Sequence, residues 1–453
     1  MLSKPPIRIG NVSGATGDHP HAMKRMVEPG GVDVITGDRL SEMSIAWNAI
    51  TKRDVDPDLG YENGFYLQLE ECLDQIMEQD IKVATNAGAL NTMSLFRKVQ
   101  ALCVERGYKD TVVAAILGDD VSDLVTDPSK RRSLHFPHLD HQDRLLDEWS
   151  LDPICANAYF GCRGIVKALE AGANIVILTF YINGLDVEAK VAMMRQQLDH
   201  ILKGNKFSRF SVEQYGSQVD NPRSQQGGTV QLRVFAQARN KADIEAPSFK
   251  ISIYALRMQS YPGYHMNLDF RTMDPRPFME IFPVVMPLSM IDHRVVLSTG
   301  QQIKVDPPQK TVEYPVMRPS SDTEDPIDLQ SLGPTKKAPF GSIVHARSGD
   351  KADNSNIGFF VRHDDEYPWL KTYLTVSRLK ELFGDDWQKG NPDRRVERVE
   401  FPGINAVHFR VLDNLNGGIA SSDRIDGLGK GIAEYLRSRS AEIPIRFLQR
   451  GWI

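Results

Sequence analysis

The sequence contains little cysteine and no long apolar run, and both absences narrow its class. Its 453 residues include four cysteines, Cys72, Cys103, Cys155 and Cys162, with no CxxC pair and no histidine at zinc-finger spacing. We therefore expect reduced thiols and no zinc site, with a nucleophile at Cys155 or Cys162 as the alternative. The most apolar run, Ala173–Ile182, is about half as long as a membrane-spanning helix.

The sequence also has no excess of positive charge. The chain has 54 Lys and Arg against 59 Asp and Glu, a net charge of −5. Nucleic-acid binders normally carry a basic domain or stripe, so we expect no nucleic-acid partner, although a local cationic pocket for an acidic metabolite remains compatible with this charge. The N-terminus lacks an apolar stretch of signal-peptide length, which predicts a soluble cytoplasmic protein without a membrane partner.

Motifs for common cofactors are absent as well. We find no sign of a nicotinamide, flavin or metal requirement, and the cofactor is left unknown. Magnesium bound by carboxylates would leave no readable motif.

The first 180 residues alternate short apolar runs with helical patterns. The expected strands are Ile7–Ile9, Val32–Ile35, Ile81–Thr85, Val112–Leu117 and Ile175–Leu178, and the expected helices are Leu67–Met77 and Ala158–Ala171. Near-continuous apolar strands separated by helices indicate an α/β fold with a parallel sheet and flanking helices. Ligands bind beyond the carboxyl ends of such strands, so the polar residues found there are expected to form a site.

The rest of the chain has a different pattern. Its middle predicts a helix at Val187–Leu202, a polar loop at Ser217–Gly228 and a strand at Thr229–Ala236, and residues 301–338 have the composition of a linker. From Phe340 onward a small α+β unit is expected. Its elements are strands at Ser342–Ala346, Ile357–Val361, Val396–Phe401 and Ala406–Val411 and a helix at Val376–Phe383.

A glycine-rich segment, Gly10–Asp18, follows the first expected strand and contains Gly14, Gly17 and Asp18. Glycines let the backbone turn tightly and approach an anion. The spacing is GxxxGxxG rather than the dinucleotide GxGxxG, and no GK[ST] element follows. A structural turn and a phosphate cradle are both compatible with the pattern.

Two further segments place asparagines near strand ends or helix starts. Asn86 follows the expected strand Ile81–Thr85, and Asn157 lies in a polar turn that enters a helix. An asparagine amide offers donors and an acceptor for a carbonyl or hydroxyl group. A purely structural role, such as helix capping, is the alternative.

The densest polar segment is His345–Gly358, which we interpret as a loop after a strand. Arg347 and Lys351 are candidates to clamp a carboxylate or phosphate, and His345 is a candidate to move protons near neutral pH. Asp350 and Asn356 complete the group. A salt-bridged loop that fixes a domain interface is the alternative.

Taken together and in order, these segments resemble the acyclic terpene utilisation (AtuA) family. The similar stretches are IRIGNVSGATGDHPHAMKRMVE, DVITGDRLSEMSI, KVATNAGALN and ICANAYFGCRGIVKALEAGANIVI. HARSGDKADNSNIGFFVR, YPWL and LNGGIASSDRIDGLGK resemble the ferredoxin-like domain that often follows the family's main domain. The resemblance implies an α/β domain at 5–300, a linker at 301–338 and a small α+β ferredoxin-like domain at 339–440.

The chain departs from the family pattern at residues 179–181. Ile177-Leu178-Thr179 runs directly into Phe180-Tyr181-Ile182, a piece that resembles a much later part of the family sequence. The middle segment of the family is therefore expected to be absent here, either in a shortened paralogue or through a misread gene model.

The resemblance implies breakdown or biosynthetic handling of branched or acyclic isoprenoid-like acids carried as coenzyme A thioesters. The leading hypothesis is an enzyme that hydrates a carboxylated acyl thioester or cleaves a C–C bond in it. Gly14, Gly17 and Asp18 would then face the phosphate or carboxylate end of the ligand. Asn86 and Asn157 would bind the reacting carbonyl group.

In the same hypothesis His345 and Asp350 form the acid/base pair. Arg347 or Lys351, with Asn356, binds the substrate. These roles require the strand ends and the loop near Asp350 to meet at one cavity.

Two other functions remain open. The chain is either a non-catalytic subunit or scaffold that partners an acyl-CoA carboxylase or synthase, or a module that binds a small acid without turnover. A homo-oligomer is compatible with each.

Overall fold

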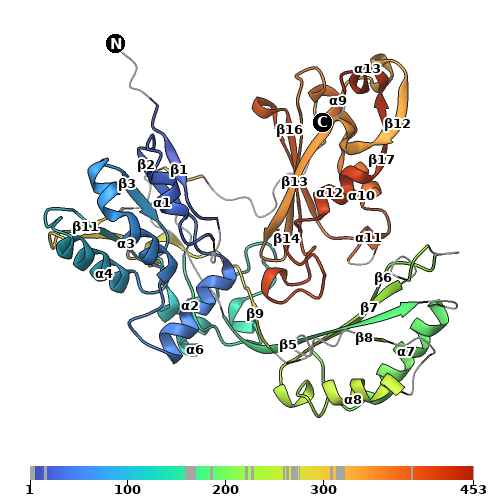
Figure 1. Ribbon diagram of the computed structural model, residues 1–453, viewed down its shortest axis with the longest axis horizontal. Coiled ribbons are helices and arrows are strands. Elements are labelled where there is room, and N and C mark those ends of the chain that lie inside the picture. The colour runs from blue at the N-terminus through green and yellow to red at the C-terminus, as the bar shows by residue number, and fades with distance from the viewer. Residues whose placement is uncertain are drawn as a thin grey trace. The chain divides into compact units, whose positions relative to one another are not determined.

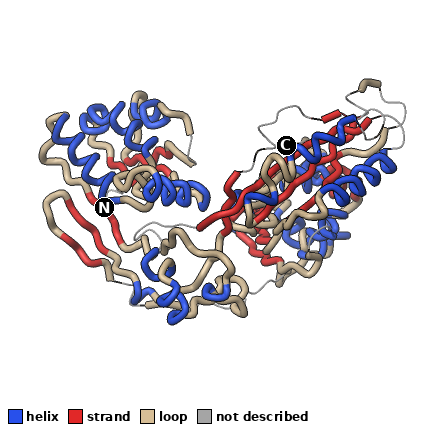
Figure 2. The backbone as a smooth tube through the Cα atoms, turned by 90° about the horizontal axis from the view of Figure 1, so that it is seen from below, coloured by secondary structure: helices blue, strands red, loops and turns tan. Residues whose placement is uncertain are grey.

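The computed structural model describes residues 6–451 except for 15–17, 159–169, 184–186, 220–222, 226–228, 259–260, 262–264, 267–273, 275, 307–309, 313–321 and 389–390 (Figure 1). The chain forms two compact units. Unit 1 comprises residues 1–172 and 279–314, and unit 2 comprises residues 173–278 and 315–453. Both contain helices and strands (Figure 2), which confirms the α/β class.

Unit 1 contains a parallel sheet. Its strands lie in the order β1 (Ile9–Asn11), β2 (Val34–Gly37), β3 (Lys82–Thr85). The accompanying helices are α1 (Ala22–Val27), α2 (Glu42–Asp54), α3 (Asn63–Glu78) and α4 (Thr92–Glu105). Leu69, Leu73 and Ile76 of α3 are buried in the same core as Ile35 of β2. The expected parallel sheet with flanking helices is confirmed.

This parallel sheet is smaller than expected. β4 (Ala114–Leu117) instead pairs antiparallel with β10 (Arg294–Leu297), which also pairs with β11 (Gln302–Lys304). β5 (Glu170–Asn183) pairs antiparallel with β7 (Thr229–Ala238). An apolar run indicates that a strand is buried, but it carries no information about the direction of a partner that comes much later in the chain.

Unit 2 begins with an antiparallel sheet in the order β6-β7-β5-β8, with β9 also paired to β5. The remaining bounds are β6 (Arg209–Tyr215), β8 (His265–Met266), β9 (Arg276–Glu280), α7 (Val187–Ile201) and α8 (Lys250–Tyr254). Met194 and Leu198 of α7 are buried in one cluster with Leu232 and Val234 of β7. The helix expected at Ala158–Ala171 lies mostly outside the described residues, and its last two residues belong to β5.

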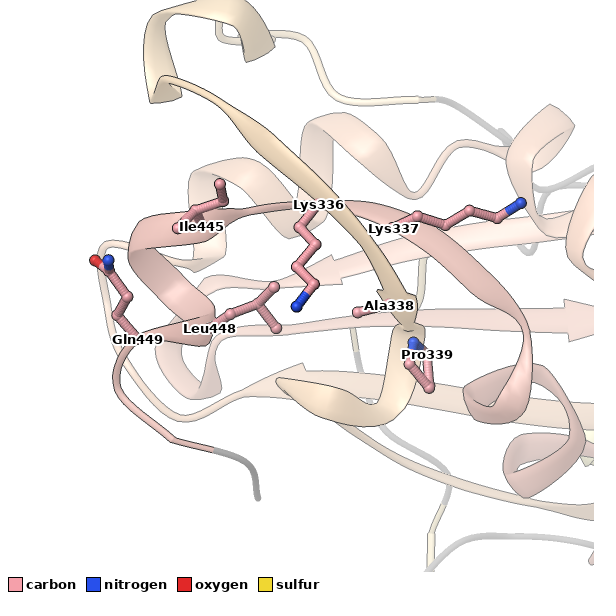
Figure 3. Close-up of a pocket in the computed structure, with 7 residues that line it drawn as sticks. All are labelled: Lys336, Lys337, Ala338, Pro339, Ile445, Leu448 and Gln449. Atoms are coloured by element: carbon pink, nitrogen blue, oxygen red, sulfur yellow. The ribbon is translucent and has the colours of Figure 1, made fainter.

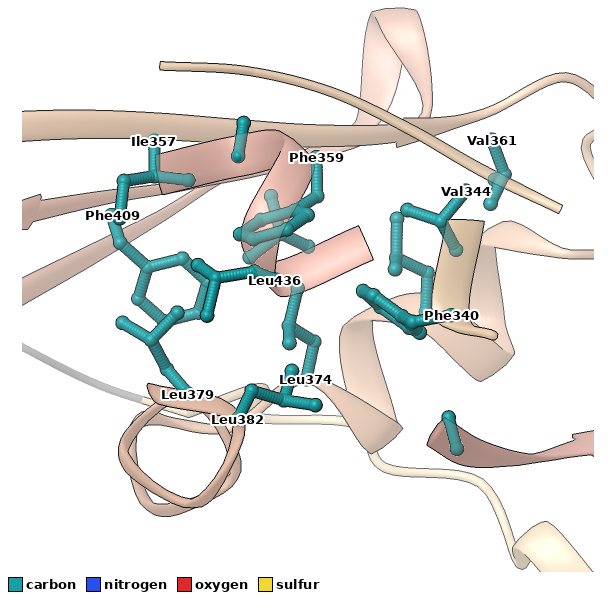
Figure 4. Packing of buried hydrophobic residues seen from close by; sticks show 14 of the residues in the cluster. Phe340, Val344, Ile357, Phe359, Val361, Leu374, Leu379, Leu382, Phe409 and Leu436 are labelled. Atoms are coloured by element: carbon teal, nitrogen blue, oxygen red, sulfur yellow. The ribbon is translucent and has the colours of Figure 1, made fainter. Parts of the chain in front are cut away.

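A second antiparallel sheet, in the order β13-β14-β16-β15, forms the C-terminal part of unit 2. The strands are β13 (Val344–Lys351), β14 (Asn354–Val361), β15 (Val396–Phe401) and β16 (Ala406–Val411), and the helices are α9 (Tyr367–Tyr373), α10 (Val376–Phe383) and α12 (Ile432–Ser438). Phe359 and Phe409 of the sheet pack with Leu374, Leu382 and Leu436 in one buried cluster (Figure 4).

Local signals set the limits of α10. The Thr375 side chain accepts a hydrogen bond from the backbone nitrogen of Arg378 at 3.1 Å, which caps the start of the helix. Gly384, with φ of 57°, follows its last residue.

The segment between the predicted domains contains regular structure. β11 and most of β12 (Thr335–Pro339) lie within residues 301–338, and β12 pairs with β17 (Ser440–Pro444). Residues 173–278 group with the C-terminal residues rather than with the remainder of 5–300. Among the described helices, none has the length and apolar character needed to cross a membrane.

Candidate functional site

The carboxyl ends of the parallel strands are tied together by Asn86. Its Oδ1 accepts a hydrogen bond from the backbone nitrogen of Arg39 at 2.8 Å, and its Nδ2 donates to Asp38 Oδ1 at 2.7 Å. The backbone nitrogen of Asp38 in turn donates to the carbonyl oxygen of Ser13 at 3.1 Å. The ends of β1, β2 and β3 therefore meet, as the sequence predicted for strands of one parallel sheet.

The glycine-rich turn after β1 is closed by its own carboxylate. Asp18 Oδ2 accepts a hydrogen bond from the backbone nitrogen of Gly14 at 2.6 Å. Asp18 thus occupies an amide that an anionic ligand would otherwise use. A Cβ atom added at Gly14 would meet no atom within 4 Å, and Gly17 lies outside the described residues.

A buried arginine lies beside this edge and was not selected from the sequence. Arg39 is 5% exposed, its NH2 group donates to Gln68 Oε1 at 2.8 Å, and its guanidinium lies 5.5 Å from the ring centre of Phe65. Burial lowers the pKa of Arg39, whereas the charges of Glu62 and Asp18 raise it. Its position directly after the strand-end residues Gly37-Asp38 is the sequence feature by which Arg39 could have been selected.

Asp119 and Asn157 form a buried polar pair beyond the end of β4. Asp119 is 6% exposed and Asn157 is 2% exposed. Asn157 Nδ2 donates to Asp119 Oδ2 at 3.1 Å, and the backbone nitrogen of Ala158 donates to the Asp119 carbonyl oxygen at 2.8 Å. Burial raises the pKa of Asp119 to about 7, although the hydrogen bond from Asn157 opposes this shift. Asp119 can therefore exchange a proton near neutral pH.

The backbone before Asp119 explains how this carboxyl group reaches the interior. Gly118 has φ of 110°, and a Cβ atom there would lie 2.4 Å from the carbonyl oxygen of Asp292. Only glycine permits the backbone at Asp292, just before β10, to come this close. The chain thus turns immediately before Asp119.

Residues 345–358 form a β-hairpin, so the expectation of a loop was wrong. β13 and β14 pair along their full lengths, and the turn between them is Ala352-Asp353. His345 and Asp350 are five positions apart on β13, which places them on opposite faces and roughly 16 Å apart. The structure does not bring the proposed acid/base pair together, and Asp350 instead pairs with Lys430 Nζ at 3.3 Å.

The other residues predicted in this segment have different surroundings. The His345 ring stacks on Phe360 with centres 4.9 Å apart, and burial lowers the pKa of His345, helped by nearby arginine charges. Arg347 and Lys351 are exposed and share the His345 face of β13. Asn356, on β14, lies opposite Gly349.

A pocket of about 370 Å³ lies between β12 and α13 (Ile445–Leu448) and contains none of the predicted site residues (Figure 3). Its lining residues are Lys336, Lys337, Ala338, Pro339, Ile445, Leu448 and Gln449.

The thiols and potential metal ligands add no further site. Cys72, Cys103 and Cys155 are buried, reduced thiols, and Cys162 lies outside the described residues. Across the described ranges, no group of three His, Cys, Asp or Glu side chains is arranged to hold a metal ion.

Comparison with known families covers most of the chain. The family described as "Acyclic terpene utilisation family protein AtuA" matches residues 7–179 and 178–297, and the "AtuA ferredoxin-like domain" matches residues 338–442. The chain belongs to the AtuA family. No curated protein and no solved structure matches it.

The two AtuA matches meet at residues 178–179, next to the position where the sequence departs from the family pattern. For this AtuA-family chain, the predicted domain limits and the cavity expected to join the strand ends to the hairpin stay predictions.

Proposed function

We propose that this AtuA-family chain is an enzyme that acts on a branched or isoprenoid-like carboxylated acyl thioester, by hydration or by C–C bond cleavage. Membership of the family indicates a role in acyclic terpene utilisation. The observation that supports an enzyme is the buried Asp119 carboxyl group, whose pKa is raised to about 7.

Both reactions need a group that exchanges a proton near the operating pH. Hydration of an α,β-unsaturated thioester adds the hydroxyl group of water at Cβ and a proton at Cα. In the cleavage of a β-hydroxy thioester, a base takes the hydroxyl proton, the Cα–Cβ bond breaks, and the resulting enolate is protonated at Cα. General acid/base catalysis is most effective when the pKa of the group lies near the working pH, as that of Asp119 does.

The two asparagines predicted from the sequence retain donors for the substrate in this proposal. Asn86 Nδ2 donates to Asp38, and Asn157 Nδ2 donates to Asp119. Each amide has a second hydrogen, which would bind the carbonyl oxygen as negative charge develops on it. Asn157 also orients Asp119, so its loss would affect proton transfer as well as binding.

The charged residues of the hairpin keep their predicted role of anion binding. Arg347 and Lys351 lie on the same face of β13, where both are exposed. In the proposal they bind an anionic group of the ligand, a carboxylate or a phosphate. His345 and Asp350 are not assigned as a pair, because they lie on opposite faces of the strand.

A substitution at Asp119 tests the proposal directly. Asp119→Asn keeps the size of the side chain and removes its proton, so kcat should fall by roughly 10²–10⁴-fold, and the inflection near pH 7 should disappear from the pH profile. The matched control is Asp123→Asn, which changes an exposed carboxylate nearby in the chain and should leave kcat nearly unchanged.

Substrates are found first with a panel of acyl-CoA thioesters in thermal-shift assays. A ligand at 100 times its Kd stabilises the folded protein by about 2.7 kcal/mol. If no thioester raises the melting temperature, or if Asp119→Asn retains full activity on one that does, the proposal is wrong.

One observation favours the alternative of a non-catalytic subunit. The family match falls into two segments that meet at residues 178–179, as expected if a middle segment is absent. The exposed apolar area that would test this reading depends on side chains at 179–185, which lie outside the described residues. Sequencing the transcript across the codons for Ile177–Gly184 would decide whether the short form is real, and a restored segment would remove the support for this alternative.

A further inference from the structure

The sheet β13-β14-β16-β15 has one face packed on helices and one open face. Val344, Ile357, Phe359, Val407 and Phe409 point into the helix-covered core. Because side chains alternate along a strand, the intervening residues lie on the other face. The pairing registers arrange them in rows that cross all four strands.

The outermost row is aromatic and is interrupted by one small residue. Across the sheet it reads His345, Phe360, Ala406 and Phe401. Phe360 is 41% exposed and Phe401 is 45% exposed, although both are large apolar side chains. Two strand spacings separate them, about 10 Å, with only the methyl group of Ala406 between.

The next row combines a cation with a second small residue. It reads Arg347, Gly358, His408 and Val399. Gly358 has no side chain, so the surface stays low between Arg347 and His408. The His408 ring meets Phe401 edge-on, with centres 6.4 Å apart and planes at 84°. A flat aromatic surface therefore lies next to a stretch of sheet, at Gly358, where no side chain projects.

Positive charge beside the aromatic row is not neutralised by carboxylates. Within the described part of the chain Arg347 and Arg362 make no ion pair. Burial lowers the pKa of His345, and the charge of Arg362 lowers it further, so Arg362 acts at the same edge of the face.

By contrast, the third row already contains its counter-ion. Arg410 NH1 lies 3.2 Å from Glu397 Oε2, and these two residues are cross-strand neighbours. The arginines that have no carboxylate partner among the described residues, Arg347 and Arg362, thus lie beside the exposed aromatic rings, whereas the arginine of the third row is paired.

This combination suits a ligand with a flat heteroaromatic ring and attached phosphates. Aromatic side chains stack on nucleobases irrespective of sequence, and arginine binds phosphate with two parallel hydrogen bonds. We propose that this open face binds the adenosine phosphate portion of a coenzyme A thioester, with the purine on Phe360 and Phe401 and a phosphate on Arg347. The inference rests on the proposed function, because it takes the acyl thioester as substrate.

The probe for this site is adenosine 3′,5′-bisphosphate, titrated calorimetrically into the full chain. Arg347→Ala should weaken binding by about tenfold or more, as expected for loss of a charged hydrogen bond. Phe401→Leu retains an apolar side chain but removes the ring, and should weaken binding by about fivefold or more. Lys337→Ala removes an exposed cation from β12 and should leave the Kd unchanged.

Folding is verified for each variant by its thermal melt, which should stay near that of the parent because the altered side chains are exposed. The inference is overturned if the bisphosphate does not bind, if Arg347→Ala and Phe401→Leu bind it as the parent does, or if single-stranded RNA binds this face more tightly than the bisphosphate.

Two outcomes separate this inference from the proposed function. Binding of the bisphosphate without turnover of any acyl thioester would support the nucleotide site and contradict the enzyme. Equal kcat/KM for a coenzyme A thioester and the matching pantetheine thioester, which lacks the nucleotide, would support the enzyme and contradict the nucleotide site.

Discussion

At the scale of single residues, burial gives Asp119 its distinct chemistry. Its neighbour Asp120 is exposed and binds the backbone and hydroxyl of Ser122, whereas Asp119 contacts Asn157 in the interior. Removal from water disfavours the carboxylate, and the hydrogen bonds from the backbone nitrogens of Asp119 and Asp120 and from the Asn157 amide compensate only part of this penalty. The carboxyl group therefore keeps its proton to a higher pH in the folded chain than in the unfolded chain.

The raised pKa of Asp119 predicts a pH-dependent stability. The pKa rises from 3.8 to about 7 on folding, so between these values the folded state binds more protons than the unfolded state. The stability that Asp119 contributes is complete below pH 4 and is lost as the pH rises to about 7. The free energy of unfolding of the parent, minus that of Asp119→Asn, should fall by about 1.4 kcal/mol per pH unit in this window.

Denaturant titrations of both proteins at pH 4 to 8 measure this difference. Subtracting the variant removes the contribution of every other group that titrates alike in both. The same difference at pH 5 and pH 8 would show that Asp119 is ionised throughout and unsuited to proton exchange.

The sequence indicated where polar residues such as Asp119 and Asn157 lie, but not which of them are buried. Gly118-Asp119-Asp120 was visible as an acidic strand end, and Asn157 as a polar turn residue, but nothing in the spacing distinguishes the buried aspartate from the exposed one. Burial depends on β10 and the residues just before it, which approach Gly118 from more than 170 residues later in the chain. Arg39 was missed because its contacts, Phe65 and Gln68, lie on a later helix, α3.

At the scale of elements, local signals were sufficient where pairing is between close neighbours. The limits of α10, β15 and β16 match the expected ranges residue for residue. Thr375 caps the helix, and the two strands form a short antiparallel pair with alternating apolar positions. Residues 345–358 were misread as a loop because the open face of their hairpin carries His, Arg, Asn and Gly instead of apolar residues.

The turn of this hairpin is fixed by the glycine-rich segment that follows β16. Asp353 Oδ1 accepts hydrogen bonds from the backbone nitrogens of Leu415 and Gly417 at 3.0 and 2.9 Å. Gly418 has φ of 69°, and a Cβ atom there would lie 2.2 Å from the carbonyl oxygen of Ala352. This segment resembles a family motif, and its glycine and backbone amides are needed to pack against the hairpin turn.

Gly418→Ala is predicted to destabilise unit 2. The positive φ alone should cost about 1–3 kcal/mol, and the contact with backbone adds to it because a carbonyl oxygen cannot rotate away. Gly403→Ala is the matched control, since a Cβ atom there meets nothing within 4 Å and its φ is not in the positive region. Equal midpoints for the two variants in urea denaturation would contradict the tight packing of the turn.

At the scale of the whole molecule, the sequence predicted the class and the family but not the direction of every strand. Strand direction was read from burial alone, so β4 and β5 were expected in the parallel sheet, whereas their partners β10 and β7 run antiparallel to them. Both partners follow in the chain by more than forty residues, beyond the reach of local patterns. The two units are consequently discontinuous in sequence.

Separate cores predict separate unfolding transitions. Among the described residues, the buried clusters of unit 1 lie at 12–146, with partly buried partners up to 290. Those of unit 2 lie at 187–261 and 338–447, with partly buried partners from 329 to 448. Calorimetry should therefore resolve two transitions, each assignable with one substitution. Leu73→Ala creates a cavity in unit 1 and Phe359→Ala in unit 2, at costs of about 2–5 and 3–5 kcal/mol.

Each substitution should lower one transition and leave the other in place, because a cavity weakens only the core that surrounds it. The two variants serve as controls for each other, since both remove a large buried side chain. If both shift a single transition by similar amounts, the units unfold as one cooperative structure. Independent transitions would mean instead that substitutions at Asp119 and on the open sheet face can be interpreted separately, one unit at a time.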